Sequence, residues 1–227
     1  MGSAGSSDEN AQKEKSVVRS LGGLVEDIKS CRHCVLSPSG PPLGHEPRPV
    51  LVASTQAKIC IIGQAPGTRV YASGKPFTDP SGDRLRDWLG VSSCEFYNPK
   101  LFSIIPMGFC FPGLNDKGAD LPPRKECAEK WQNELFERMP QIELNLLVGM
   151  YAQRWHLGKR RKKTLSETVR CWREYMPHKQ DKAREPAVLP MPHPSWRNNA
   201  WLRKNPFFER DVIPYLRGEV ARLIGKE

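Results

Sequence analysis

Residues 58–63 read Lys-Ile-Cys-Ile-Ile-Gly, and this stretch decides the fold. A short, almost entirely apolar run that stops at a glycine is typical of a strand buried on both faces of a parallel sheet. Similar apolar runs follow at residues 101–107, 144–148 and 187–191, with helical patterns between them. This alternation predicts an α/β fold: a three-layer α/β/α sandwich with a central, mainly parallel four-stranded sheet.

The connections between these runs carry helix signals. An apolar stripe over residues 17–28 predicts a helix before the first strand. A second amphipathic stripe ends at Gly90, which adopts the left-handed conformation that closes helices. The spacing Thr164-x-x-Glu167 is a capping box. The last helix is expected to begin near residues 205–206 and to be kinked by Pro214.

Size and charge limit the class of protein. The 227 residues suffice for one domain of roughly 200 residues, so we expect a single domain over 16–227. Residues 1–15 are poor in apolar side chains and are expected to form a disordered tail. No apolar run approaches the ~20 residues that a membrane-spanning helix needs, which excludes a membrane-spanning protein. A net charge of +10 favours a polyanionic partner, either nucleic acid or an anionic surface.

The cysteines indicate the compartment. The chain has seven, an odd number, and no N-terminal pattern of a secretory signal, which together predict a reducing, intracellular and cytoplasmic setting. Disulfides are rare there. The pair Cys31-x-x-Cys34 therefore indicates metal, cluster or redox chemistry rather than a covalent staple.

Four segments follow the predicted strands, at the sheet edge where ligands of open parallel sheets bind. They are residues 63–67, 108–115, 151–163 and 193–196. The first, Gly-Gln-Ala-Pro-Gly, is a glycine-rich turn that suits close approach of a planar or anionic ligand to backbone N–H groups. It has neither the Gly-Lys-Ser/Thr of a phosphate-binding loop nor the Gly-x-Gly-x-x-Gly of a dinucleotide site. Taken alone, it fits a purely structural turn equally well.

A resemblance to a known family rests on several segments in order: residues 63–67, residues 74–82, Cys110 with Asn115, and residues 193–195. Together they resemble the uracil-DNA glycosylase superfamily, and most closely its iron-sulfur family 4 and relatives. The resemblance spans roughly residues 20 to 224. It implies hydrolysis of the N-glycosidic bond of a deaminated base, usually uracil, which leaves an abasic site in DNA. Enzymes of this class extrude the base from the stack.

The resemblance also implies roles for single residues. His193 stands at the position of the catalytic histidine, and would donate a hydrogen bond to uracil O2 as negative charge builds on the departing base. Phe77 would stack on the base, and Asn115 would recognise its edge, since an amide both donates and accepts. Gly63 and Ala65 would line the substrate pocket. The structural alternatives are a loop histidine, a core aromatic ring and an ordinary turn former.

The chain departs from the family where a carboxylate would activate water. Family 4 carries Glu immediately after the first glycine of its motif, where this chain has Gln64, and family 1 carries Asp one residue later, where it has Ala65. Neither side chain can act as a base. We therefore expect Gln64 to position water and Asp79 to supply the carboxylate, with Asp83 as second candidate. The alternative for Asp79 is that it caps the helix that opens near Ser81.

Four cysteines match the cluster ligands of family 4 in their spacing, C-x2-C-x75-C-x16-C: Cys31, Cys34, Cys110 and Cys127. Four thiolates suit a [4Fe-4S] cluster, and zinc with four cysteines is equally sound chemistry. Spacing does not choose between them. A cluster here would staple the N-terminal segment to the sheet rather than act on the substrate.

The candidate DNA contacts come from two segments: Arg160, Arg161 and Lys162 in a run of five cations, and Ser195, Trp196 and Arg197 where the superfamily inserts a wedge into the duplex. The run suits a phosphate clamp, with a solvated loop as its alternative. These features predict a monomeric, monofunctional repair glycosylase that removes uracil from DNA. Its rivals are a noncatalytic binder of abasic sites or single-stranded DNA, which the missing motif carboxylate permits, and an iron-sulfur redox protein, which leaves the basic run unexplained.

Overall fold

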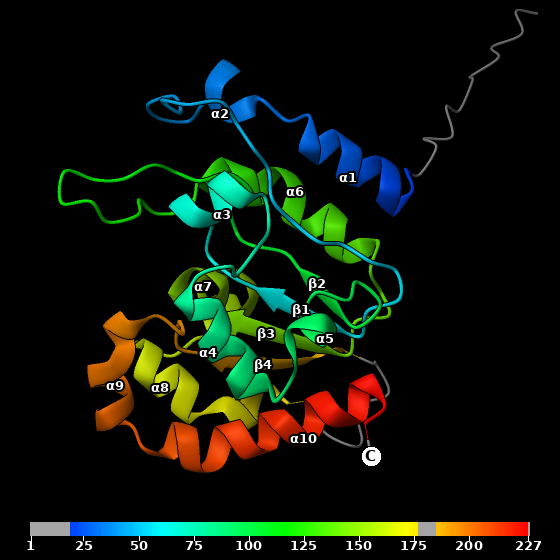
Figure 1. Ribbon diagram of the computed structural model, residues 1–227, viewed down its shortest axis with the longest axis vertical. Helices are drawn as coiled ribbons and strands as arrows, with labels where there is room; N and C mark the ends of the chain where they lie inside the picture. The colour runs from blue at the N-terminus through cyan, green and yellow to red at the C-terminus, as the bar shows by residue number, and fades with distance from the viewer. Residues whose placement is uncertain (1–18, 177–184, 227) are drawn as a thin grey trace, which may run out of the picture.

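The sheet consists of four parallel strands in the order β2-β1-β3-β4 in the computed structural model, which describes residues 19–176 and 185–226 (Figure 1). The strands are β1 (Ile59–Ile62), β2 (Phe102–Ile104), β3 (Leu144–Val148) and β4 (Ala187–Met191). The predictions for β1, β3 and β4 are confirmed. The strand predicted over residues 101–107 is shorter, because Pro106 has no N–H to donate to the ladder.

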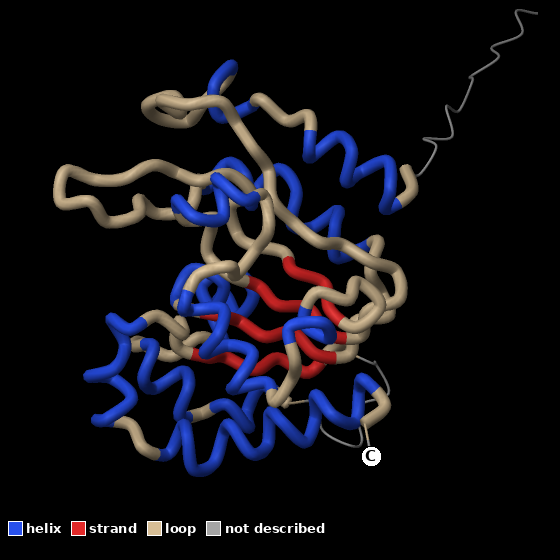
Figure 2. Tube along the Cα trace, in the orientation of Figure 1, coloured by secondary structure: helices blue, strands red, loops and turns tan. Residues whose placement is uncertain are grey.

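Helices cover both faces of the sheet (Figure 2). They are α1 (Leu21–Lys29), α2 (His33–Leu36), α3 (Thr68–Ser73), α4 (Pro80–Leu89), α5 (Ser93–Phe96), α6 (Lys125–Glu137), α7 (Met150–Leu157), α8 (Leu165–Arg170), α9 (Asn199–Lys204) and α10 (Ile213–Ile224). Short 3-10 turns lie at η1 (Gly158–Arg160), η2 (Trp172–Tyr175) and η3 (Trp196–Asn198), and a π-helical turn at η4 (Phe208–Val212).

The core consists of two apolar layers, one on each face of the sheet. Ile59 and Ile61 of β1 face a layer built with α4, α8 and α10, whereas Cys60 and Ile62 face a layer built with α1, α6 and α7. This alternation follows from the period of two in a strand. In the view of Figure 1, α1 and α6 lie above the sheet and α8 and α10 below it. The predicted three-layer α/β/α sandwich is confirmed.

Local signals set the ends of several helices. The capping box of Thr164 and Glu167 opens α8, and Gly90 closes α4 in the left-handed conformation with φ +68°, as predicted. The predicted effect of Pro214 takes a specific form. Proline cannot donate the next helical hydrogen bond. The chain accommodates it with the wider turn η4 directly before α10, in whose first turn Pro214 stands.

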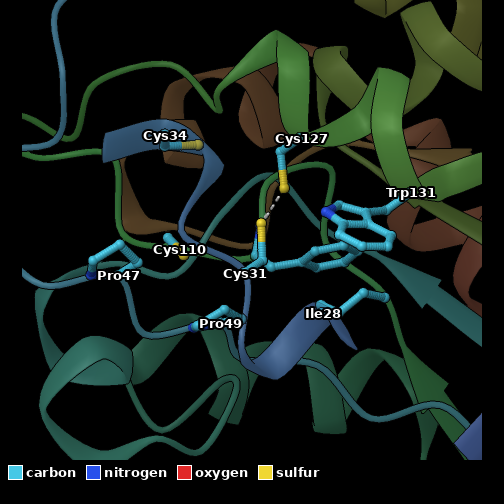
Figure 3. Close-up of a pocket in the computed structure, with 9 residues that line it drawn as sticks. Ile28, Cys31, Cys34, Pro47, Pro49, Cys110, Cys127 and Trp131 are labelled. Carbon is cyan, nitrogen blue, oxygen red and sulfur yellow. Dashed lines mark hydrogen bonds between the residues drawn. The ribbon is translucent and has the colours of Figure 1, made fainter. Parts of the chain in front are cut away.

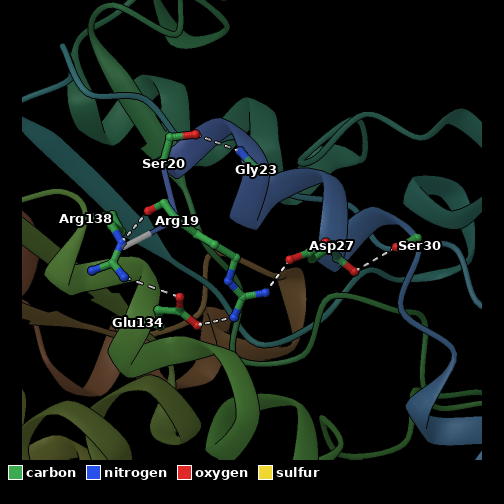
Figure 4. A network of polar contacts seen from close by, with 7 residues as sticks. All are labelled: Arg19, Ser20, Gly23, Asp27, Ser30, Glu134 and Arg138. Carbon is green, nitrogen blue, oxygen red and sulfur yellow. Dashed lines mark hydrogen bonds and ion pairs between the residues drawn. The ribbon is translucent and has the colours of Figure 1, made fainter. Parts of the chain in front are cut away.

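Helix α1 is fastened to α6 by both apolar and polar contacts. Leu24 and Ile28 are fully buried in the layer shared with α6. Figure 4 shows the polar part: Arg19 pairs with Asp27 and, at 3.3 Å, with Glu134. Because exposed ion pairs contribute less than about 1 kcal/mol each, the buried side chains carry most of the attachment. This attachment fixes the helix that leads to Cys31.

His156 links α7 to α6 and gives the fold a pH dependence. Its ring lies edge-on to Phe136 at 5.0 Å, and burial lowers the pKa of His156 from 6.5 to about 4. Between pH 6.5 and about 4, the His156 side chain therefore binds a proton in the unfolded chain but not in the folded chain. The free energy of unfolding should fall as pH drops from 6.5 toward 4, with His156 contributing up to roughly 3 kcal/mol.

Urea unfolding curves at several pH values between 7 and about 4 test this expectation. The variant His156→Gln removes the titrating ring, so its stability should depend less steeply on pH than that of the wild type. Parallel pH dependences of the two proteins would show that His156 is not the source.

Two further sequence expectations concern the N-terminal tail and membrane-spanning helices. The tail predicted over residues 1–15 lies outside the described residues. Among the helices that are described, none combines the length and the apolar composition needed to cross a bilayer.

Candidate active site

The loops that follow the strands begin side by side at one edge of the sheet. Backbone bonds continue the strand pairing into them: Met107 N–H donates to Gly63 O at 3.0 Å, and Gly149 N–H to Met191 O at 3.0 Å. The carboxyl ends of β1 to β4 thus meet, as expected for an open parallel sheet. The segments predicted to carry chemistry enter this edge together.

The ring of Phe77 lies against Gly63, the first residue after β1. A β-carbon at Gly63 would stand only 3.4 Å from Cζ of Phe77, so glycine there permits the close approach. On its other side the ring meets Phe96 edge-on at 5.9 Å, and Phe77 is only partly buried. Phe77 therefore borders the core while keeping part of its surface free beside the glycine-rich turn.

The backbone of Phe77 is strained and held in place. Its φ is +54°, in the left-handed region that residues other than glycine rarely adopt. The Phe77 carbonyl accepts hydrogen bonds from Tyr97 Oη at 3.0 Å and from Arg86 Nη1 at 3.2 Å. A β-carbon at Gly82 would stand 1.9 Å from the same carbonyl oxygen, so only glycine fits there. Strain fixed by several contacts is characteristic of functional loops.

Gln64 extends from the end of β1 toward the end of β3. Its Nε2 lies 2.7 Å from the position that a β-carbon of Gly149 would take, and the φ of +88° at Gly149 favours glycine there. The neighbouring Ala65 is partly buried in the same turn. The amide of Gln64 thus lies at the centre of the sheet edge, where β1 and β3 are adjacent.

His193 follows β4 with one ring nitrogen already engaged. The Ser195 N–H donates to Nδ1 of His193 at 3.2 Å. Because a backbone N–H only donates, Nδ1 is an acceptor, and a neutral ring therefore carries its proton on Nε2. Burial lowers the pKa of His193, Asp79 acts in the opposite direction, and Arg197 lowers it further. At neutral pH the ring is a neutral hydrogen-bond donor.

Asp79 both caps a helix and acts on this histidine. Its Oδ1 accepts from Gly82 N–H at 3.3 Å at the start of α4, as the capping alternative predicted. Its charge also reaches His193. The second candidate, Asp83, lies on the outer surface of α4, 78% exposed and paired with Arg86 at 2.6 Å.

Sequence reasoning missed Asp120. Its Oδ2 lies 3.4 Å from the place of a β-carbon on Gly67, the last residue of the glycine-rich turn. Partial desolvation raises the pKa of the exposed Asp120; Arg197 opposes this rise and Asp79 adds to it. Asp120 follows no motif, and only the folded chain brings it to the turn. A second carboxylate therefore interacts with Asp79 and Arg197.

Asn115 lies in an exposed turn of the segment that follows β2. Its Oδ1 accepts from the N–H groups of Lys117 at 3.0 Å and Ala119 at 2.9 Å. The Oδ1 of Asn115 thus serves its own loop, as the turn-forming alternative describes. The role of Asn115 in base recognition stays a prediction.

One comparison with known proteins decides the family. The model of the uracil DNA glycosylase superfamily matches residues 50–217. The chain belongs to this superfamily. The match runs from before β1 into α10 and includes His193, Asp79 and Asp120, but it begins after Cys31 and Cys34. Membership indicates a DNA glycosylase, a hydrolase whose substrate is DNA.

The four cysteines expected to bind a cluster in this glycosylase line one pocket (Figure 3). The remaining lining of this pocket is apolar, with Trp131 and Phe109 among it. Phe109 N–H donates to Sγ of Cys127 at 3.4 Å. Burial raises the pKa of the Cys34 and Cys127 thiols, and that of Cys110 to about 12. Within the described ranges, no three His, Cys, Asp or Glu side chains form a site for a single metal ion.

The side chains of the two candidate DNA-contact segments differ in whether they already have partners within the protein. Lys162 is paired with Glu174 at 2.6 Å, and Arg160 lies over the ring of Tyr175 at 5.7 Å. Trp196, in contrast, is 72% exposed, with the guanidinium of Arg197 over its ring at 5.9 Å. The glycosylase therefore presents one large exposed aromatic side chain immediately after the His-Pro-Ser segment.

Proposed function

We propose that this glycosylase hydrolyses the N-glycosidic bond of uracil in DNA and leaves an abasic site. The observation that carries the proposal is the hydrogen bond from Ser195 N–H to Nδ1 of His193. It directs the single proton of the neutral ring to Nε2, which is then the donor that a departing uracil anion needs at O2. The free part of the Phe77 ring, beside Gly63 and Ala65, would stack on the extruded base.

The charges around His193 support bond cleavage. As the bond from the sugar to N1 breaks, the base becomes negative and the sugar positive. Asp79 and Asp120 would stabilise the cationic sugar, while His193 stabilises the leaving base. Gln64 has no basic group, so it would orient the attacking water, and a carboxylate would accept the proton that the water releases.

Asp79→Asn separates the catalytic role of this residue from its capping role. Asparagine caps helices as well as aspartate does, so α4 should stay intact. The rate of uracil release should fall on the order of 10²-fold, with a smaller loss for Asp120→Asn. Single-turnover excision assays measure both. Asp83→Asn is the matched control and should release uracil like the wild type; a larger loss in that variant would move the carboxylate role to Asp83.

We also propose that Cys31, Cys34, Cys110 and Cys127 hold a [4Fe-4S] cluster. The four soft sulfur donors, the apolar lining and the N–H donated to Cys127 suit such a group. A zinc ion needs all four sulfurs about 2.3 Å from one point, whereas a cluster spreads them over four irons. Because no three of the described His, Cys, Asp or Glu side chains form a site for one ion, we propose the cluster rather than zinc. When bound, it would cross-link the N-terminal segment to the sheet.

DNA would be held by charge and by a wedge. Arg160, Arg161 and Lys162 would contact phosphates, with Lys162 exchanging its Glu174 partner for DNA. Trp196 would occupy the space that the extruded base leaves in the stack, supported by Arg197, while Ser195 would contact the flanking backbone.

One assay tests the proposed activity. An oligonucleotide with a single uracil is incubated with the protein and then treated with alkali, which cleaves the strand at abasic sites. Cleavage that depends on uracil is the expected result. Retarded mobility without cleavage would instead identify a noncatalytic DNA-binding protein, the alternative that Gln64 in place of a motif carboxylate permits.

A further inference from the structure

Helix α4 contacts both loops that carry the candidate catalytic groups. Its buried side chains belong to the apolar layer that it shares with α10 on one face of the sheet (Figure 1). Arg86 of α4 donates to Phe77 O at 3.2 Å. Arg84, two positions earlier, donates from Nη1 to Ser195 O, also at 3.2 Å. Asp79, the N-cap of the helix, interacts with the histidine after β4. One helix thus holds both loops.

The turn that carries His193 is held by donors from two places. Pro194 has no N–H, so the turn relies on its neighbours. The His193 carbonyl accepts from Nδ2 of Asn198 at 2.7 Å, and the Ser195 carbonyl accepts from Asn198 N–H at 3.0 Å. Arg84, which lies 111 positions away along the chain, is the second donor to the Ser195 carbonyl. Asn198 therefore shapes the turn locally, whereas Arg84 attaches it to α4.

Ser195 connects Arg84 to the histidine ring. Its carbonyl accepts from Arg84, and its N–H donates to Nδ1 of His193. Because both groups belong to one residue, a rotation of the Ser195 backbone that breaks the first bond also misaligns the second. A hydrogen bond from a guanidinium is stronger than one between neutral groups, and Arg84 is partly buried, which limits competition from water. Arg84 is therefore able to keep the Ser195 N–H directed at Nδ1.

We propose that Arg84 is a positioning residue of this glycosylase. By holding the Ser195 carbonyl, it keeps the Ser195 N–H on Nδ1 of His193 and the proton of the neutral ring on Nε2. Without this attachment the proton would occupy Nδ1 in part of the molecules, and those molecules have no donor at Nε2. Because Asn198 still shapes the turn, the loss should be partial. The inference rests on the proposed function, which takes Nε2 as the donor to the leaving base.

Nitrogen NMR of protein labelled with ¹⁵N-histidine tests the proposal without any substrate. At neutral pH, one ring nitrogen of His193 in the wild type should have the chemical shift of a bare acceptor and the other that of a protonated donor, and the spectrum of His193→Ala identifies these signals. Arg84→Met keeps the aliphatic stem but removes the donor, so the two shifts should move toward each other. Unchanged shifts would overturn the proposal. A protein that never releases uracil refutes the proposed activity, while this spectrum still decides the role of Arg84.

Single-turnover kinetics test whether Arg84 acts through the histidine. Arg84→Met should slow uracil release on the order of tenfold, and Arg84→Lys, which restores a donor, should recover part of the rate. In the His193→Ala background, Arg84→Met should have little further effect, because the two residues act as one unit. Affinity for a duplex with a stable abasic-site analogue should equal that of the wild type. Additive losses would overturn the proposal, and weaker affinity with an unchanged tautomer would make Arg84 a DNA contact instead.

Arg217→Met is the matched control. Arg217 of α10 donates from Nη2 to the carbonyl of Asp87 at 2.8 Å, near the opposite end of α4. The variant therefore removes the same kind of bond from the same helix, but not at the turn of His193. Its histidine spectrum and its rate of uracil release should equal those of the wild type. Equal changes in Arg217→Met and Arg84→Met would show a general loosening of α4 and overturn the proposal.

Discussion

His193→Ala is expected to slow uracil release by roughly 10²–10³-fold, the usual effect of removing one donor from a developing anion. The reason is the fixed tautomer. Because Ser195 N–H donates to Nδ1, the proton of the neutral ring is on Nε2, and the ring does not have to reorient before it donates to the base. Affinity for an abasic duplex should change little, since this donor acts on the departing base. Single-turnover rates and anisotropy measure the two effects.

The pH profile gives this prediction an independent check. Burial lowers the pKa of His193, so the wild type should keep its neutral donor below pH 6.5 and lose activity only at more acidic pH. Asp79 raises this pKa and Arg197 lowers it. The acidic limb should therefore move to lower pH in Asp79→Asn and to higher pH in Arg197→Ala. Shifts in the reverse directions would remove His193 from the role of neutral donor.

Cys110→Ser should cause the largest loss of stability. If the four cysteines hold a cluster, the loss of the Cys110 thiolate removes the metal bond that links the N-terminal segment to the loop after β2. Because bound metal contributes several kcal/mol to folding, the melting temperature should fall by roughly 10 °C or more. Thermal unfolding, the iron content per chain and the visible absorbance of the cluster measure the effect together.

Cys94→Ser is the control for the cluster, because Cys94 is exposed and lies outside the pocket. It should keep the metal, the colour and the melting temperature. A colourless wild type with one zinc per chain would correct the metal but keep the ligands. Unchanged metal content in Cys110→Ser would contradict the ligand assignment.

The elements that sequence predicted best depend on local physics. β3 and β4 run exactly over their predicted residues because each is a short apolar run that has to be buried on both faces. The capping box at Thr164 and the glycine at Gly90 act within one helical turn. Such signals need no knowledge of distant residues.

Only some residues of the candidate site could be predicted from the sequence, because others come together only when the chain folds. Asp120 lies far from the glycine-rich turn along the chain. It contacts Gly67 only because the segment around Leu114 and Asp120 folds back on itself. For Asn115, spacing favoured a role in the pocket, whereas the hydrogen bonds to its own loop place it in a turn. The strained φ of Phe77 has no sequence signal, since it follows from the carbonyl's position against Gly82.

The central claim is that His193 stabilises the negative charge of the leaving base, and a better leaving group tests it most directly. 5-Fluorouracil departs as a more stable anion than uracil and therefore needs less help. The ratio of the wild-type rate to the His193→Ala rate should be clearly smaller for 5-fluorouracil than for uracil. Equal ratios for the two bases would contradict the account.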